Sequence, residues 1–258
     1  MAQENINVTN DSKKLRTCKE DQGERRRGRF IVIEGLDKSG KSTQSSRLAE
    51  WLRIEHGLEV ISMCFPDRTT EIGHCIDQYL KSKSDISHKA AHLLYSANRW
   101  EKQTNIRQAL EDGKMVVCDR YAFSGIAYTH GIFNESLSWC MYPDEGLLAP
   151  DLVIFLESDP NRNMATRLES GQKERYEDAD KQQKVGEAFR AFYGSPGWHT
   201  VATGGQSIEQ VHEKIKSLVT PIVVRCEHTK ACVSNTGKVV ELDLPEGLDE
   251  SWHFLNFV

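Results

Sequence analysis

A short glycine-bounded segment near the start of the chain ends in a lysine and a serine. The segment reads Gly35-Leu-Asp-Lys-Ser-Gly40-Lys41-Ser42, which fits the pattern G-x-x-x-x-G-K-[S/T]. Loops of this kind bind nucleotide phosphates, because the glycines let backbone N–H groups point at phosphate oxygens and the following helix adds partial positive charge. We expect Lys41 to reach the β- and γ-phosphates and the Ser42 hydroxyl to ligate Mg²⁺. The alternative is a glycine-rich turn with a chance Lys-Ser pair.

Charged residues also follow two other apolar runs. One run ends in Asp119-Arg120, and another ends at Phe65 and is followed by Arg68. A carboxylate at the end of a buried strand beside a phosphate loop is placed to hold Mg²⁺ through water. An arginine there can bind a phosphate through two parallel hydrogen bonds. Asp119 and Arg120 could instead form a simple ion pair at the end of a strand.

An aromatic residue and an arginine, Tyr95 and Arg99, are spaced to lie one above the other on a helix. An aromatic face beside a planar donor group suits a flat base with an acceptor oxygen on its edge. The alternative is a core tyrosine next to a surface arginine. Further along, the segment Arg167–Tyr176 also carries Lys173 and Arg175. It is either a solvated loop or a mobile lid that closes cations over transferring phosphates.

The elements that must position these residues alternate between strands and helices. Strands are expected over residues 30–34, 58–65, 114–119, 151–156 and 198–202. Helices are expected over 42–54, 72–80, 88–110, an interrupted 121–140, 159–168, 181–193 and 207–225, with a loop over 169–180. Within 88–110, a core-facing side is expected to include Leu93, Leu94, Ile106 and Leu110. This alternation predicts a three-layer α/β fold, a five-stranded parallel sheet with helices on both faces, whose ligands bind at the carboxyl ends of the strands.

The composition is typical of a globular protein with a buried core. The chain has 258 residues, 38% of them apolar and 28% charged, and a net charge of −5. That charge argues against a protein that coats nucleic acid or anionic membrane, and no apolar run is long enough for a membrane span. Seven scattered cysteines without a Cys-x-x-Cys pair indicate a reducing compartment, not a disulfide framework or zinc site.

The two ends of the chain differ from its centre. Residues 1–28 are polar and are expected to form a disordered leader. The basic run Arg25–Arg29 is either the solvated end of this leader or a patch for nuclear import or a polyanion. A single domain is expected over 29–226. Residues 227–258 are expected to form an acidic tail, since 241–258 hold five acids and no lysine or arginine.

Several motifs, taken in order, resemble those of thymidylate kinases of the eukaryotic branch, over about residues 28–225. The motifs are Glu34–Gln44, Phe65-Pro-Asp-Arg68, Thr70-Glu-Ile-Gly73, His92–Glu101, Asp119-Arg-Tyr-Ala-Phe-Ser-Gly125, Pro150-Asp-Leu-Val153 and Glu174-Arg-Tyr-Glu177. The resemblance implies a P-loop NTPase-like fold with a short lid over about 168–181. It also implies that the chain phosphorylates dTMP to dTDP with ATP and Mg²⁺, as a homodimer in the cytoplasm, with a nuclear pool left open.

The resemblance also implies a role for each matching residue. The residues implied to bind ATP are Lys38, Ser39, Gly40, Lys41, Ser42, Thr43 and Arg167, the last near adenine. Those implied to bind dTMP are Asp37, Phe65, Arg68, Tyr95, Arg99, Arg120, Gly125, Tyr128 and Tyr176. Phe65 and Tyr95 flank thymine, Arg99 bonds its O4, and Tyr176 selects deoxyribose. Arg68 and Arg120 hold the monophosphate, and Asp37 lies near it and the 3′-hydroxyl. The implied catalytic residues are Lys41, Lys38, Arg120 and Asp37, the metal-binding residues Ser42 and Asp119, and the lid cations Lys173 and Arg175.

Some positions depart from the family pattern. Lys38 stands where an arginine is usual, so part of the stabilisation of the transferring phosphoryl group passes either to Lys38 or to the lid cations. Tyr95 replaces a phenylalanine, Asp67 replaces a glutamate, and the lid is about one residue longer.

Two other functions remain open, another nucleoside or nucleotide kinase and an inactive nucleotide-binding regulator. Arg68 and Arg120 argue against an acceptor that lacks a phosphate, whereas Lys38 is the feature that favours an inactive protein.

Overall fold

The sheet has five parallel strands. The computed structural model describes residues 27–159, 174–227 and Leu255. Its strands are β1 (Phe30–Gly35), β2 (Val60–Cys64), β3 (Met115–Asp119), β4 (Leu152–Glu157) and β5 (Trp198–Ala202). They follow the order β2-β3-β1-β4-β5, and every neighbouring pair is parallel. The predicted five-stranded parallel sheet is therefore confirmed, with shifts of one or two residues at some strand ends.

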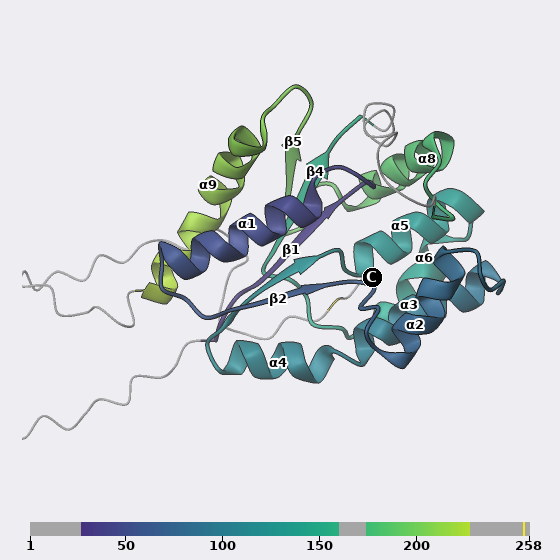
Figure 1. Cartoon of the computed structure of the whole chain (residues 1–258), viewed down its shortest axis with the longest axis horizontal. Helices are drawn as coiled ribbons and strands as arrows, with labels where there is room; N and C mark the ends of the chain where they lie inside the picture. The colour runs from purple at the N-terminus through teal and green to yellow at the C-terminus, as the bar shows by residue number, and fades with distance from the viewer. Residues whose placement is uncertain (1–26, 160–173, 228–254, 256–258) are drawn as a thin grey trace, which may run out of the picture.

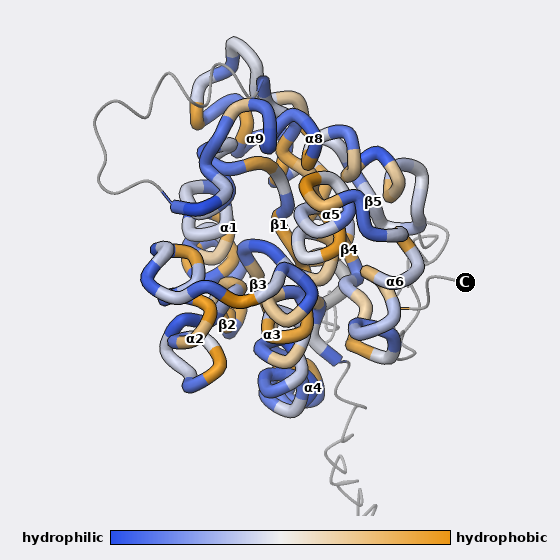
Figure 2. The backbone as a smooth tube through the Cα atoms, turned by 90° about the vertical axis from the view of Figure 1, so that its right-hand side faces the viewer, coloured by the Kyte–Doolittle hydropathy of each residue, from blue (hydrophilic) through white to orange (hydrophobic). Residues whose placement is uncertain are grey.

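Helices cover both faces of this sheet (Figure 1). The helices are α1 (Lys41–Ile54), α2 (Glu71–Leu80), α3 (His88–Trp100), α4 (Gln103–Glu111), α5 (Ala122–Phe133), α6 (Leu137–Met141), α8 (Ala179–Phe189) and α9 (Ile208–Glu227). In β1, Ile31 and Ile33 pack with α1 and α9, whereas Phe30 and Val32 pack with α4, α5 and α8. Figure 2 shows β1 lying between α1 on one side and α5 on the other. The period-two alternation of buried strand residues thus divides the core into two layers.

The carboxyl ends of the three central strands meet at one edge. Ile33 of β1 lies level with Asp119 of β3, and Cys64 of β2 is in turn paired with Asp119. The loops that follow β1, β2 and β3 therefore leave the sheet side by side. This edge is where an open parallel sheet binds its ligands.

The helix expected over 88–110 is in fact two helices. It breaks after Trp100, where Lys102 N–H bonds Arg99 C=O in a tighter turn. The Glu101 carboxylate there accepts hydrogen bonds from Asn98 Nδ2 at 2.7 Å and from Thr70 Oγ1 at 2.5 Å, which connects the end of α3 to the start of α2. No glycine or proline marks this break, so periodicity alone predicts one continuous helix. The expectation for Leu93 was also wrong, since its side chain is 50% exposed.

Two described residues outside the expected domain of 29–226, Arg27 and Leu255, contact that domain. Arg27 donates two hydrogen bonds to the Asp151 carboxylate at 2.9 and 2.6 Å, and Phe30 N–H donates to the same group at 2.8 Å. Arg27 is therefore held by the folded domain and is not free to act in a basic patch. Leu255, near the other end, is buried against the core. Residues 160–168 of the expected helix and 169–173 of the expected loop lie outside the described residues. The described remainder of that loop, 174–180, leads into α8, which begins at Ala179.

No helix in the described part of the chain has the length and apolar character that a membrane span requires.

Candidate active site

The loop between β1 and α1 wraps tightly around the side chain of Lys41. Gly35 has φ +150°, and a Cβ atom there would lie 2.7 Å from Ser39 Oγ and 2.8 Å from the Leu156 carbonyl oxygen. Gly40, at φ +95°, directly precedes α1. Both positions require glycine, which is why the motif carries glycines at these points. The loop thus has the conformation that the sequence pattern predicted.

Lys41 is buried inside this loop. Its ammonium group donates to the Leu36 carbonyl and lies 3.4 Å from Ser39 Oγ. Burial and the nearby Arg120 charge lower the pKa of Lys41 to about 7, although Asp37, Asp119 and Glu34 oppose the shift. An incoming triphosphate would raise this pKa again, because it brings negative charge to the ammonium group. Lys38, by contrast, is exposed at the tip of the loop with φ +62°.

Ser42 and Asp119 lie together beneath the loop. Ser42 Oγ donates to Asp119 Oδ2 at 2.5 Å. Asp119 Oδ1 is buried and has no hydrogen-bond partner among the described residues. A buried carboxylate oxygen without a partner beside a serine hydroxyl is an oxygen donor set that suits Mg²⁺. The two residues predicted to hold the metal are therefore brought together.

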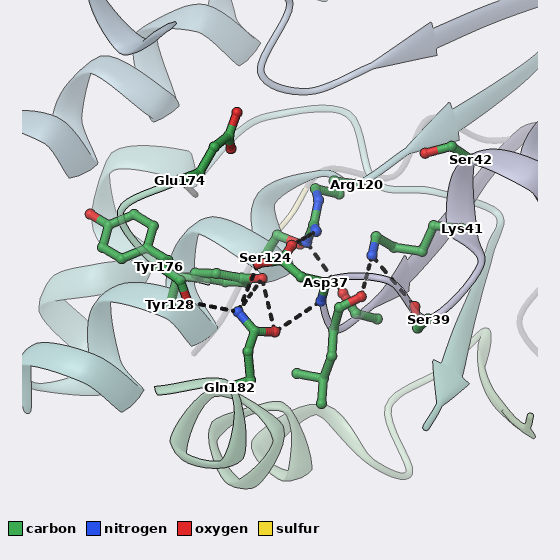
Figure 3. Close-up of polar contacts among 12 residues, drawn as sticks. Asp37, Ser39, Lys41, Ser42, Arg120, Ser124, Tyr128, Glu174, Tyr176 and Gln182 are labelled. Atoms are coloured by element: carbon green, nitrogen blue, oxygen red, sulfur yellow. Dashed lines mark hydrogen bonds and ion pairs between the residues drawn. The ribbon is translucent and has the colours of Figure 1, made fainter. Parts of the chain in front are cut away.

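Arg120 and Asp37 form an ion pair between the phosphate loop and β3. Arg120 Nη2 donates to Asp37 Oδ1, and Nη1 donates to Gly35 C=O and Ser124 Oγ, both at 3.2 Å (Figure 3). Burial would raise the pKa of Asp37, but the Arg120 and Lys41 charges lower it overall. The two residues, predicted from separate motifs, thus meet in one cleft.

Two residues with no predicted role of their own support this pair. Glu34 is fully buried and accepts hydrogen bonds from Ser124 Oγ at 2.5 Å and Tyr121 N–H at 2.8 Å. Gln182 of α8 donates to Asp37 Oδ2 at 2.7 Å and accepts from Asp37 N–H at 2.9 Å (Figure 3). Glu34 could have been found from the sequence, as a carboxylate in a buried strand just before the glycine loop. Gln182 has no such signal, because it comes from a helix distant in sequence.

A cavity of about 180 Å³ opens beside Arg120. Its lining includes all nine residues expected to bind the acceptor nucleotide: Asp37, Phe65, Arg68, Tyr95, Arg99, Arg120, Gly125, Tyr128 and Tyr176. These residues come from five separate parts of the chain. The structure thus brings together in one cavity all the residues that the resemblance implies for the acceptor.

Arg99 enters the cavity wall from α3 and is held by a residue that sequence reasoning missed. Its Nε and Nη2 donate to the two Asp144 oxygens at 3.0 and 2.6 Å, and the side chains of Arg99 and Asp144 are 2% and 0% exposed. A Cβ atom at Gly125 would lie 2.9 Å from Arg99 Nη2. Gly125 therefore leaves the room that the guanidinium needs.

Arg68 is occupied by acidic groups. It donates to Glu174 through Nη1 at 2.8 Å and Nη2 at 3.2 Å, and to Asp77 at 2.8 Å. These carboxylates raise the pKa of Arg68, the Glu174 hydrogen bond contributing most. A carboxylate on a guanidinium occupies the position that a phosphate would take.

Arg175, the one expected lid cation among the described residues, does not lie over the phosphate loop. Arg175 donates to the carbonyls of Tyr79 at 3.0 Å and Ser84 at 3.1 Å and pairs with Asp85 at 3.2 Å. The Arg175 guanidinium therefore binds the end of α2 and the segment that follows, not the phosphate loop, which corrects the expectation for this residue. Arg167 and Lys173 lie outside the described residues.

Comparisons with known proteins identify the family of this chain. The sequence model of the family described as thymidylate kinase matches residues 33–215. The chain is 43% identical to the thymidylate kinase of Plasmodium falciparum over 79% of its own length and 95% of that protein. It is 44% identical to the human thymidylate kinase, over 75% and 90% of the two chains. The solved thymidylate kinase of Candida albicans superposes with a TM-score of 0.67 at 37% identity, over 75% and 92% of the two chains. On its sequence, its fold and the match across most of its length, this chain belongs to the thymidylate kinase family.

Proposed function

We infer that this protein transfers the γ-phosphoryl group of ATP to dTMP, giving dTDP and ADP. Its place in the thymidylate kinase family supports this reaction. The observation that carries it in the structure is a cavity with two arginines, Arg68 and Arg120, directly beside a phosphate-binding loop. Two cations for the acceptor suit a nucleoside monophosphate better than a nucleoside. A nucleoside kinase and an inactive nucleotide-binding protein are therefore not favoured.

On the donor side, residues 38–43 bind the triphosphate of ATP. We propose that the backbone N–H groups of Gly40 and Thr43 face the phosphates at the start of α1, where the helix adds partial positive charge. Ser39, whose N–H donates to Leu36 C=O at 3.2 Å, completes the loop beside them. Lys41 supplies a cation inside the loop. Arg167 is proposed to lie near adenine on the family resemblance alone.

Ser42 and Asp119 would hold Mg²⁺ together with the nucleotide phosphates. The unpartnered Asp119 Oδ1 supports this assignment. When bound, the ion neutralises phosphate charge and orients the triphosphate. The chain's own contribution is to place the Asp119 carboxylate beside the Ser42 hydroxyl at the start of α1.

On the acceptor side, the arginines and Asp37 orient the monophosphate. We propose that Arg120 bonds the dTMP phosphate while Asp37 fixes the guanidinium from behind. Arg68 binds the same phosphate after Glu174 has given way. Since a phosphate monoester needs no strong base to attack, these residues act by alignment and charge neutralisation.

The base and sugar occupy the remainder of the cavity. Phe65 and Tyr95 flank thymine, and Arg99 donates to O4 from its Asp144-supported position. Gly125 and Tyr128 complete the pocket. Tyr176 lies where a ribose 2′-hydroxyl would compete for space, with its own hydroxyl bonded to Tyr79 at 2.9 Å, and so selects deoxyribose.

The transition state is proposed to be stabilised by Lys41, Arg120 and Lys38. We favour Lys38 over Arg175 for this role, because Arg175 is bound elsewhere. As an exposed side chain on a loop with fixed backbone, Lys38 can swing toward the γ-phosphate without disturbing the fold. We also propose that a lid over about 168–181, which includes Lys173, excludes water from the reaction.

We also propose a homodimer. Three large apolar side chains near the cavity are exposed: Leu93 at 50%, Trp100 at 42% and Tyr142 at 66%. Leu93 and Trp100 lie on α3, and the Trp100 indole N–H donates to Pro143 C=O at 2.7 Å, beside Tyr142. Analytical ultracentrifugation of the wild type and Leu93→Asp tests this face, and a dimer unchanged by the substitution would place the interface elsewhere.

The proposed location is the cytoplasm. Imaging of the tagged chain tests whether a nuclear pool exists.

A coupled ADP-release assay tests the reaction. It compares dTMP, dUMP, AMP, CMP and thymidine as acceptors with Mg-ATP. We expect dTMP to give the highest kcat/KM and Lys41→Ala to abolish turnover. Faster reaction with thymidine than with dTMP, or no acceptor-stimulated ADP release, would overturn the proposal. Retention of substantial activity in Lys41→Ala would show that the phosphate loop is misassigned.

A further inference from the structure

Leu255, near the C-terminus, is built into the wall behind the nucleoside cavity. Its side chain is 8% exposed and belongs to the core cluster that also contains Leu147 and Leu148. Its N–H donates to Leu147 C=O at 2.8 Å, and its C=O accepts from Gly146 N–H at 3.0 Å. Leu255 thus provides the hydrogen-bond partner for Gly146 N–H and for Leu147 C=O, although it lies more than a hundred positions further along the chain.

The segment that Leu255 contacts, Asp144–Leu148, holds two residues of the cavity wall in place. Asp144 at its start binds Arg99 through both carboxylate oxygens. Leu148 at its end accepts a hydrogen bond from the Tyr121 hydroxyl at 3.0 Å. Arg99 and Tyr121 both line the cavity.

Leu255 and Arg99 are connected by a short series of hydrogen bonds. Leu255 N–H bonds Leu147 C=O, Leu147 N–H bonds Asp144 C=O at 3.2 Å, and the Asp144 side chain bonds Arg99. Gly146, with φ +87°, lies inside the same turn. The same turn therefore carries both the side chain that binds Arg99 and the backbone groups that bond Leu255.

We propose that Leu255 is a positioning residue for nucleoside recognition, which fixes the Asp144–Leu148 segment and through it the guanidinium of Arg99. This inference rests on the proposed placement of thymine at Arg99. Leu255 lies beyond residues 33–215, which match the family model. Leu255 would thus contribute to the substrate site from outside the region that matches the family model.

Loss of the Leu255 contact should weaken dTMP binding selectively. Without it, Gly146 N–H and Leu147 C=O lose their partners and the turn that carries Asp144 loosens. Arg99 then loses its fixed orientation toward the base. Disturbing one hydrogen bond to a charged group should raise KM for dTMP by about tenfold. The phosphate loop is positioned by β1 and α1, so KM for ATP should change by less than about twofold, and kcat little, since no contact to the reacting phosphates changes.

The experiment compares variants of the full-length chain. Leu255→Asp puts a charge into the buried contact, Leu255→Ala removes most of the side chain, and Leu255→Met keeps an apolar group of similar volume. The matched control is Val219→Ala, a truncation in the core cluster on the opposite face of the sheet. Melting temperature, kcat, KM for dTMP and KM for ATP are measured for each.

We expect Leu255→Asp and Leu255→Ala to raise KM for dTMP, Leu255→Met to restore it, and Val219→Ala to lower the melting temperature without changing KM for dTMP. If Leu255→Asp does not fold, Leu255→Ala carries the test. An unchanged KM for dTMP in Leu255→Ala, or an equal rise in both KM values, would overturn the inference. Arg99→Ala separates the two proposals: if it leaves KM for dTMP unchanged, the proposed base site is wrong, whatever Leu255 does.

Discussion

The buried pair of Arg99 and Asp144 gives the sharpest quantitative prediction. Asp144→Asn removes the negative charge but leaves a side chain of nearly the same shape. Among the described residues, Asp144 provides the single carboxylate within ion-pair distance of Arg99. Because both side chains are almost fully buried, water cannot replace the lost charge. The Arg99 guanidinium is then a buried charge without an ionic partner.

The cost follows from this burial. Removing one partner of a buried ion pair typically destabilises a protein by about 3–5 kcal/mol. The amide oxygen that Asp144→Asn leaves behind can still accept one hydrogen bond, so we expect the lower end, about 3 kcal/mol. For a domain of this size that corresponds to a fall in melting temperature of roughly 6–12 °C. The variant should still fold, because proteins of this size are commonly stable by about 5–15 kcal/mol.

Urea unfolding and calorimetry of three variants provide the assay. They are Asp144→Asn, Arg99→Leu and the double variant Arg99→Leu/Asp144→Leu. Replacement of both charges by apolar groups should be less damaging than Asp144→Asn, because no unpaired charge stays buried. The double variant should nevertheless bind dTMP poorly, since the proposed donor to the base is gone. A loss below about 1 kcal/mol in Asp144→Asn, within the range of exposed ion pairs, would refute the reasoning.

Three further predictions concern the cavity and the loop. ATP affinity should fall as pH rises from about 6 to about 8. The reason is that Lys41 has a pKa of about 7 in the free protein and only its protonated form attracts phosphate. Calorimetric titration checks this, and an affinity that does not change with pH would contradict it. Gly125→Ala should raise KM for dTMP by about tenfold. The new Cβ atom would lie 2.9 Å from Arg99 Nη2, and Asp144 keeps the Arg99 side chain from moving away. Steady-state kinetics at saturating ATP measure this, and an unchanged KM for dTMP would count against such crowding. Glu174→Gln should tighten dTMP binding about threefold in a direct titration, because the phosphate no longer has to displace a charged group from Arg68; weaker binding would mean that Glu174 holds Arg68 in place.

The strands and the phosphate loop could be predicted because their signals are local. An apolar run such as Phe30–Ile33 followed by a glycine loop carries its structure within about ten residues of sequence. The break between α3 and α4 could not be predicted in this way. It depends on hydrogen bonds from Asn98 and Thr70 to Glu101, one of which joins residues 31 positions apart. Periodicity describes the face of a helix but not the contacts that end it.

The site shows the same division between local and distant information. Arg68, Arg99 and Arg120 each belong to a short motif, whereas each binds a carboxylate that comes from far along the chain. Arg99 and Asp144 are 45 positions apart, and Arg68 and Glu174 are 106 apart. Gln182 lies 145 positions from Asp37. A single sequence therefore predicts the groups that bind the substrate better than those that hold them.

These partners change what the net charge of −5 means for function. Arg68, Arg99 and Arg120 each meet a carboxylate, so the empty cavity is far less positive than its arginines suggest. Such pairing keeps buried guanidinium groups oriented before substrate arrives, which lowers the reorganisation that binding requires. Lys41 and Lys38 differ, because neither has a carboxylate within ion-pair distance among the described residues. Among the described site cations, the two that form no ion pair thus both lie in the phosphate loop, where the transferring phosphoryl group must pass.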